Sequence, residues 1–302
     1  MRKEWLFHIL KTKEESLFMR ESSTFNINGE QFPEGKDLND KTRKNCLFLS
    51  VVSQFNGEIS TKIIKWFRKL RVSRSRDYKM FLDRTVSRLE EDSGLREDVA
   101  KFITVADNGV ENFEIESKVP IAQLASNISQ TEKKDYKKTF IYFIHRDFNI
   151  DKQTNDTLKL NFNSFESEVT KKMFALSVPI IDALRDGEIL VVDELENHLH
   201  PLLFKHIIKL FNSSSNKNAA QLVFATHNLT CMNNECFRRD QIWFTEKNSF
   251  GESNLFSLAD YKLNDTKIRK DASYSKDYLL GKYGAVPFID EINLSFEKKN
   301  ES

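Results

Sequence analysis

Apolar residues recur every three or four positions in the first third of the chain, and this spacing predicts helices. Ser60 is a suitable N-cap for the first helix, the second is expected to end at Ser93–Gly94, and residues 107–109 (Asp-Asn-Gly) close the third. The apolar positions that define these helices are Ile63, Phe67, Leu70, Phe81, Val86, Leu89, Val99, Phe102 and Ile103. A helical region is therefore expected before residue 110.

The pattern changes from helical to extended after residue 138. Residues 139–145 are aromatic and β-branched, and residues 158–163 alternate between apolar and polar side chains. Together they predict an antiparallel hairpin with one buried face. A helical stripe follows from about residue 170 to residue 185, where Pro179 is expected to kink the helix and Gly187 to end it.

Three short apolar runs follow, at residues 189–192, 222–225 and 242–244. The first two are separated by a helical pattern that begins at Pro201, a residue suited to the first turn of a helix. Continuous apolar strands that alternate with helices are typical of a parallel sheet covered on both faces. The fold class predicted for this region is α/β.

The overall charge of the chain does not indicate a class of binding partner. The 302 residues contain 46 Lys and Arg against 45 Asp and Glu, so no global field steers the chain toward nucleic acid or an anionic membrane. A local basic run at residues 68–76 is interpreted as a solvated face, with a nucleic-acid or partner contact as the alternative.

Cysteine usage and hydropathy indicate a compartment. Three cysteines, an odd number without close spacing, are typical of reduced cytosolic thiols. No apolar run approaches the ~18 residues of a membrane span. We expect a cytoplasmic protein without a membrane partner.

The glycines exclude two common nucleotide-binding loops within these residues. Only nine glycines are present, and none of them has the spacing of a Walker A loop or of a dinucleotide-binding fingerprint.

Two adjacent carboxylates form the main candidate site. Asp193 and Glu194 directly follow the apolar run 189–192, at the strand end where α/β sheets bind ligands. In nucleotide hydrolysis, such a pair holds Mg²⁺ through water and polarises the attacking water. His227 follows the next apolar run, from which it could reach a terminal phosphate.

These residues also allow other interpretations. A carboxylate pair at a strand end also occurs by chance in many α/β proteins. Zinc is weakly supported, because no cysteine pair or His-Glu-x-x-His helix accompanies the histidines, and capping or core roles suit His198 and His200 better. A Ser/His/Asp hydrolase lacks its Gly-x-Ser-x-Gly elbow. The histidines considered as zinc ligands are His198, His200, His206 and His227.

At this point the sequence resembles the ABC-like AAA-family ATPases, which include the RecF, OLD and abortive-infection types. Residues 189–201 (ILVVDELENHLHP) resemble their Walker B strand and D-loop, and residues 222–228 (LVFATHN) resemble their switch-histidine strand. The likeness extends to residues 5–7, 46–56, 239–247, 269–273 and 281–289.

The resemblance implies a P-loop NTPase half-sheet with covering helices, preceded by a helical lid region, and it implies the cofactors ATP and Mg²⁺. It assigns catalytic roles to Glu194 and His227, a water-mediated Mg²⁺ contact to Asp193, and D-loop positions to Asn197 and His200.

The family's signature motif Ser-x-Gly-Thr has a counterpart in residues 166–172. Ser167, Thr170 and Lys171 are the nucleotide contacts implied there, but Val169 stands in place of the glycine that lets a backbone approach the γ-phosphate across a dimer. Activation of one subunit's site by a dimer partner is thereby put in question.

In the family, the Walker A segment comes before the segment that residues 5–7 resemble. We therefore expect the chain to be the carboxyl-terminal portion of such an ATPase, with residues 1–125 a strand remnant plus lid and residues 126–302 the core. Its expected partners are a dimer partner or an amino-terminal Walker A polypeptide, and nucleic acid stays open.

Two functions follow as hypotheses. The first is a truncated or split ATPase in a DNA-linked or antiphage response, inactive as an isolated chain. The alternative is a catalytically inactive binding subunit.

Overall fold

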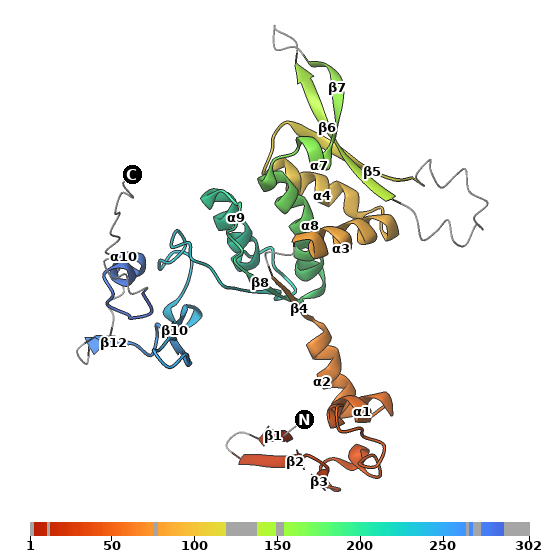
Figure 1. Cartoon of the computed structure of the whole chain (residues 1–302), viewed down its shortest axis with the longest axis vertical. Helices are drawn as coiled ribbons and strands as arrows, with labels where there is room; N and C mark the ends of the chain where they lie inside the picture. Colours follow the sequence, from red (N-terminus) through yellow and green to blue (C-terminus); the bar gives the residue numbers. More distant parts are fainter. Residues whose placement is uncertain are drawn as a thin grey trace, which may run out of the picture.

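The computed structural model of the chain is mixed α/β and describes residues 3–10, 13–74, 78–118, 138–148, 154–263, 266–267 and 273–286 (Figure 1). None of the helices within these ranges has both the length and the apolar character that a bilayer crossing requires.

The amino-terminal unit is an antiparallel sheet in the order β1-β2-β3, followed by a short 3₁₀ helix and two α-helices. Its apolar core includes Phe18, Phe32 and Phe48. In Figure 1 this unit lies at one end of the molecule and α2 connects it to the rest. The elements are β1 (Lys3–Leu10), β2 (Lys13–Glu21), β3 (Thr24–Ile27), η1 (Pro33–Gly35), α1 (Phe48–Gln54) and α2 (Glu58–Arg68).

The first predicted helix is confirmed as α2, but its predicted start and end are wrong. The helix begins at Glu58 with Gly57 as N-cap, because the Glu34 carboxylate accepts hydrogen bonds from the backbone N–H groups of Ile59 and Ser60. That carboxylate takes the place of a side-chain cap at Ser60. Leu70 lies beyond the helix and opens a strand.

The central sheet contains three parallel strands in the order β4-β8-β9. Its strands are β4 (Leu70–Arg74), β8 (Ile189–Asp193) and β9 (Gln221–Phe224), and its covering helices are α8 (Glu168–Asp186) and α9 (Pro201–Asn212). The parallel pairing of the first two predicted apolar runs is confirmed. Leu190 and Val192 of β8 point into a core shared with both helices.

The third predicted strand is wrong as a member of this sheet. It forms β10 (Trp243–Lys247), which pairs antiparallel with β11 (Ser253–Ser257), and β4 is the third parallel strand instead. The strand β4 was not predicted, because its residues lie within the basic run. Arg71 donates to the Glu188 carboxylate, with Nε–Oε2 and Nη2–Oε1 distances of 2.9 and 2.7 Å. Arg71 is thus paired rather than part of a solvated face, and Arg76 lies outside the described residues.

A layer of helices and an antiparallel sheet packs against α8. The second and third predicted helices are confirmed as α3 and α4. The predicted hairpin is confirmed as β6 and β7, with β5 adding a third strand, but its predicted end is wrong, because Phe162 and Asn163 begin a helix. The elements are α3 (Tyr78–Glu91), α4 (Leu95–Thr104), β5 (Val110–Lys118), β6 (Lys138–Phe148), β7 (Thr154–Asn161) and α7 (Phe162–Phe165).

One core joins this layer to α8. Phe113 of β5, Phe143 of β6 and Phe162 of α7 all contact Phe174 of α8 or one another through aromatic rings 5.2–6.4 Å apart. The predicted domain boundary at residues 125 and 126 lies outside the described residues, and it stays a prediction.

The helix α8 ends as predicted at Gly187, which caps it with a left-handed φ of 63°. A Cβ atom at this position would lie 2.3 Å from the carbonyl oxygen of Asn218, so a glycine is required. Pro179 lies inside α8, which continues to Asp186.

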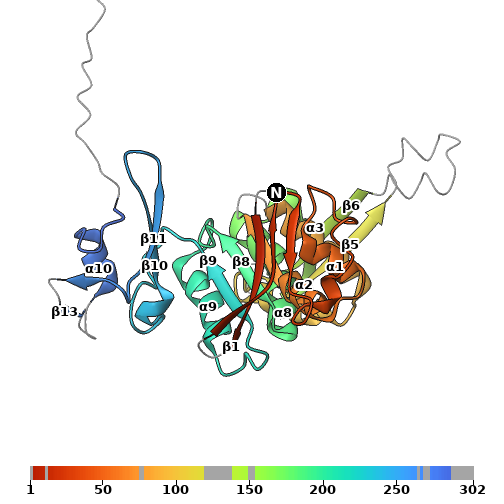
Figure 2. The same ribbon diagram turned by 90° about the horizontal axis from the view of Figure 1, so that it is seen from below.

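The carboxyl-terminal part lies beside the central sheet (Figure 2). Its core contains Phe244, Leu258, Tyr274 and Tyr283. Besides β10 and β11, its elements are η3 (Arg239–Gln241), β12 (Lys262–Leu263), β13 (Thr266–Lys267) and α10 (Tyr274–Leu279).

Candidate functional site

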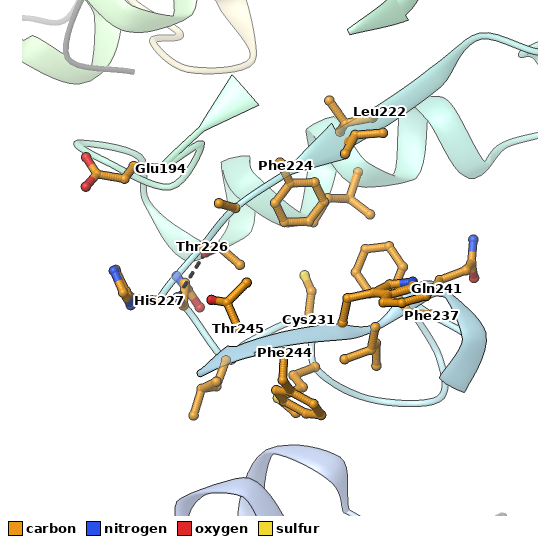
Figure 3. Close-up of a pocket in the computed structure, with 18 of the residues that line it drawn as sticks. Glu194, Leu222, Phe224, Thr226, His227, Cys231, Phe237, Gln241, Phe244 and Thr245 are labelled. Atoms are coloured by element: carbon orange, nitrogen blue, oxygen red, sulfur yellow. Dashed lines mark hydrogen bonds between the residues drawn. The ribbon is translucent and has the colours of Figure 1, made fainter. Parts of the chain in front are cut away.

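The carboxyl ends of β8 and β9 meet at one end of an open cleft. Asp193 is the last residue of β8, and β9 is followed closely by Thr226 and His227. Because the two strands are parallel neighbours, these side chains reach the same edge of the sheet. All of them, with Glu194, line a cleft of about 1320 Å³ between β9 and β10 (Figure 3).

Glu194 has an unusual backbone. Its φ is 50°, in the left-handed region that a non-glycine residue enters at a cost of roughly 1–3 kcal/mol. The Nδ2 of Asn197 donates a 2.6 Å hydrogen bond to Glu194 Oε2, and Asn197 N donates to Glu194 O at 3.1 Å. The predicted D-loop residue Asn197 thus fixes the predicted catalytic carboxylate.

Glu196 connects the loop after β8 to His227 after β9, and no role was predicted for it from the sequence. Its Oε1 accepts a 2.8 Å hydrogen bond from the backbone N–H of His227. Its other oxygen, Oε2, is buried and accepts no hydrogen bond from the described part of the chain. A carboxylate between the apolar run 189–192 and the predicted helix start at Pro201 was the signal that the sequence offered.

Lys172 is the second residue that sequence reasoning missed. Its side chain enters from α8 and donates to the carbonyl oxygens of Leu195 at 2.9 Å and Asn197 at 2.7 Å, with Glu194 O at 3.4 Å. Burial lowers the pKa of Lys172 to about 8, although the charges of Glu196 and Glu194 act in the opposite direction. Its neighbour Lys171, which the resemblance favoured, instead bonds to Asn163 O and the Glu168 carboxylate.

The signature counterpart lies at the start of α8 and does not line the cleft. Ser167 is the N-cap: its Oγ accepts from Thr170 N at 3.1 Å and shares a 2.8 Å hydrogen bond with Thr170 Oγ1. Val169 packs against the central core. The structure therefore does not bring Ser167, Thr170 and Lys171 together with Glu194 and His227 around one cleft.

His200 is a capping residue, as predicted. Its Nδ1 accepts a 3.2 Å hydrogen bond from Leu202 N at the start of α9, directly before Pro201. His198 is exposed, with a φ of 60°.

The exposed carboxylate of Asp193 suits a water-mediated contact to Mg²⁺. Within the described ranges, no three His, Cys, Asp or Glu side chains converge closely enough to hold a metal ion by themselves. Mg²⁺ in nucleotide sites needs only one or two carboxylates, since water and the substrate phosphates supply its other ligands. Asp193 and Glu194 therefore suit a metal that arrives with a nucleotide.

Comparison with known proteins gives one positive result. No curated protein matches the chain. A family model matches residues 2–233, a range that contains β4, β8, β9 and the residues Asp193, Glu194 and His227. The chain therefore belongs to the family described as "AAA domain, putative AbiEii toxin, Type IV TA system", whose AAA domain is a nucleotide-binding ATPase fold of the P-loop class.

Proposed function

We propose that the chain forms the Walker B and switch half of a Mg-ATP-hydrolysing site of the ABC-like type. The observation that carries this proposal is the convergence of Asp193, Glu194 and His227 at one end of the cleft beside β9. The strained backbone of Glu194 supports it, because strain of this kind is concentrated at functional sites.

Each residue has a role that its position favours. Asp193, exposed at the end of β8, would hold Mg²⁺ through water, and the ion would neutralise phosphate charge. Glu194 orients the attacking water and accepts its proton. His227 is exposed and donates a hydrogen bond to the phosphate that is transferred.

The phosphate-binding loop must come from outside residues 1–302, because these contain no Walker A sequence. The edges of β9 and β10 support a position for this loop and the strand before it. In the described part of the chain, β9 pairs only with β8 and β10 only with β11, and side chains from both β9 and β10 line the cleft.

In Figure 3, β9 and β10 run in the same direction, as Leu222 and Phe224 of β9 and Phe244 and Thr245 of β10 show. Val223 of β9 and Trp243 of β10 are 52% and 54% exposed, so each of the two strands presents an exposed apolar side chain to the cleft. A parallel apolar strand between β9 and β10 would form hydrogen bonds with the backbone groups at both strand edges. Its carboxyl end would lead into a loop beside Glu194. The cleft volume also exceeds the ~300–1,000 Å³ of common small-molecule sites.

A catalytically inactive binding subunit is the second candidate. Val169 favours it, because this side chain packs into the core at the position where the family has a glycine. The family description supports the proposal of an antiphage or toxin–antitoxin role for either candidate.

The test uses phosphate release from Mg-ATP. The 302-residue chain is expected to turn over far more slowly than the ~1 s⁻¹ at the low end of common enzymes. A fusion that adds an apolar strand, a Walker A loop and a helix ahead of Met1 is expected to bind and hydrolyse ATP.

Variants of this fusion separate the two candidates. Glu194→Gln should retain ATP binding and lower hydrolysis by roughly 10²–10⁴-fold, the worth of a general base. Glu235→Gln is the matched control, since Glu235 is exposed and lies outside the cleft lining. A fusion that binds no nucleotide, or that hydrolyses it equally well with Glu194→Gln, would leave the inactive binding subunit as the better description.

A further inference from the structure

The ammonium group of Lys172 lies beneath the loop that carries Glu194. Lys172 is only 5% exposed, and it lies on a helix whose neighbouring residues Met173 and Phe174 are fully buried. An ammonium group has three N–H donors, and it points at the carbonyl oxygens of residues 194, 195 and 197. One side chain thus collects three carbonyl groups from a stretch of four residues.

Stability alone does not explain a charge at this position. A buried cation costs free energy of desolvation, and an apolar side chain of similar volume is often neutral or stabilising in its place. The desolvation is visible in the lowered pKa of Lys172. The charge is better explained by the conformation that it imposes on residues 194–197.

The hydrogen bonds constrain how Glu194 presents its carboxylate. Three carbonyl groups that point at one atom require the chain to turn tightly, and Glu194 has a left-handed φ of 50° at the start of this turn. The Glu194 side chain lies at the end of the cleft where His227 also lies (Figure 3). Glu196 holds the same loop to His227 N, so the turn is anchored from two directions.

We propose that Lys172 is a positioning residue for Glu194: its ammonium group holds the loop of residues 194–197 in the strained turn that sets the position of the Glu194 carboxylate at the end of the cleft. The inference rests on the proposed function only for the role of Glu194 in hydrolysis. The anchoring itself is a property of the chain without nucleotide.

Hydrogen exchange of backbone amides tests the anchoring in the 302-residue chain. Lys172→Met removes the donors and keeps a long apolar stem, and it is expected to speed exchange at Leu195 and Asn197 by on the order of tenfold, the effect of losing hydrogen bonds to a charged group. Amides of β6 should keep their wild-type rates. Lys172→Arg, which keeps a donor cation, should lie closer to the wild type.

Lys171→Met is the matched control. It removes the same charge from the neighbouring residue, whose side chain contacts Asn163 and Glu168 and not the loop of residues 194–197. Equal exchange of the loop in Lys171→Met and Lys172→Met would overturn the proposal. A uniform rise across the loop and β6 would also overturn it, since it would indicate a loss of global stability. If Lys172→Met does not fold, Lys172→Gln is measured by the same criteria.

A kinetic measurement on the fusion with a Walker A segment tests the consequence for catalysis. Lys172→Met should lower kcat and leave KM for ATP close to the wild type, because the phosphates are held by the added loop. An unchanged kcat with a raised KM would overturn the role in positioning Glu194. If the fusion hydrolyses no ATP, the proposed function fails, whereas the exchange experiment still decides whether Lys172 anchors the loop.

Discussion

The buried Lys172 should make the free energy of unfolding depend on pH in the alkaline range. Its pKa is lowered from the ordinary 10.5 to about 8 in the folded chain, because burial disfavours the charged form. Between these two values the unfolded chain binds more protons than the folded chain. Stability contributed by this group therefore rises with pH from about 8 to about 10.5.

The size of the effect follows from the two pKa values. A pKa lowered from 10.5 to about 8 corresponds to about 3 kcal/mol in total, at ~1.4 kcal/mol per pH unit. The slope is steepest midway, near pH 9, where it is slightly more than ~1 kcal/mol per pH unit. Cys231 acts in the opposite direction, since burial raises its pKa to about 12 and its contribution to stability falls with pH above about 9.

Urea unfolding followed by far-UV circular dichroism, at several values between pH 7.5 and 10, gives the required free energies. The informative quantity is the difference between the wild type and Lys172→Met, because Cys231 and all other groups titrate in both. This difference should change by about 2–3 kcal/mol between pH 7.5 and 10, in favour of the wild type at high pH.

Equal pH dependence of the wild type and Lys172→Met would refute the reasoning. It would mean that the hydrogen bonds to three carbonyl oxygens offset the desolvation and leave the pKa of Lys172 near its ordinary value. The variant Lys172→Arg supplies a further check, because a guanidinium group does not titrate in this range and its difference from Lys172→Met should be flat.

Three stability predictions concern the scaffold of the site, each measured by chemical unfolding at pH 7. Phe174→Ala should cost about 3–5 kcal/mol, because it leaves a cavity where three aromatic rings contact Phe174; Phe250→Ala, at an 88% exposed position, is the control and should be nearly neutral. Gly187→Ala should cost more than ~1 kcal/mol, because the added Cβ would meet Asn218 O at 2.3 Å with φ at 63°, and a neutral result would show that the turn is free to move. His200→Ala should cost about 0.5–2 kcal/mol through loss of the cap on α9, and no loss of stability would argue against that role.

The helices and the hairpin followed from sequence because their signals are local. The period of three to four in α2 to α4, the alternation in β7 and the stop at Gly187 depend on residues within one or two turns. The carboxylates Asp193 and Glu194 could likewise be placed at a strand end from the apolar run before them. Their presence in one cleft with His227 followed from the expectation that two strands were parallel neighbours.

What only the tertiary structure decided involves residues far apart in the chain. The strand β4 pairs with β8 more than a hundred residues later in the chain, and Arg71 contacts Glu188 there. The short, charged sequence of β4 carries no local signal for this pairing. Lys172 and Glu196 form hydrogen bonds with backbone groups, of Leu195 and of His227, which any residue type supplies, so no sequence pattern marks these contacts. Successive residues of a helix point about 100° apart, so only one of Lys171 and Lys172 can face the loop. The packing of α8 decides that Lys172 is the buried one.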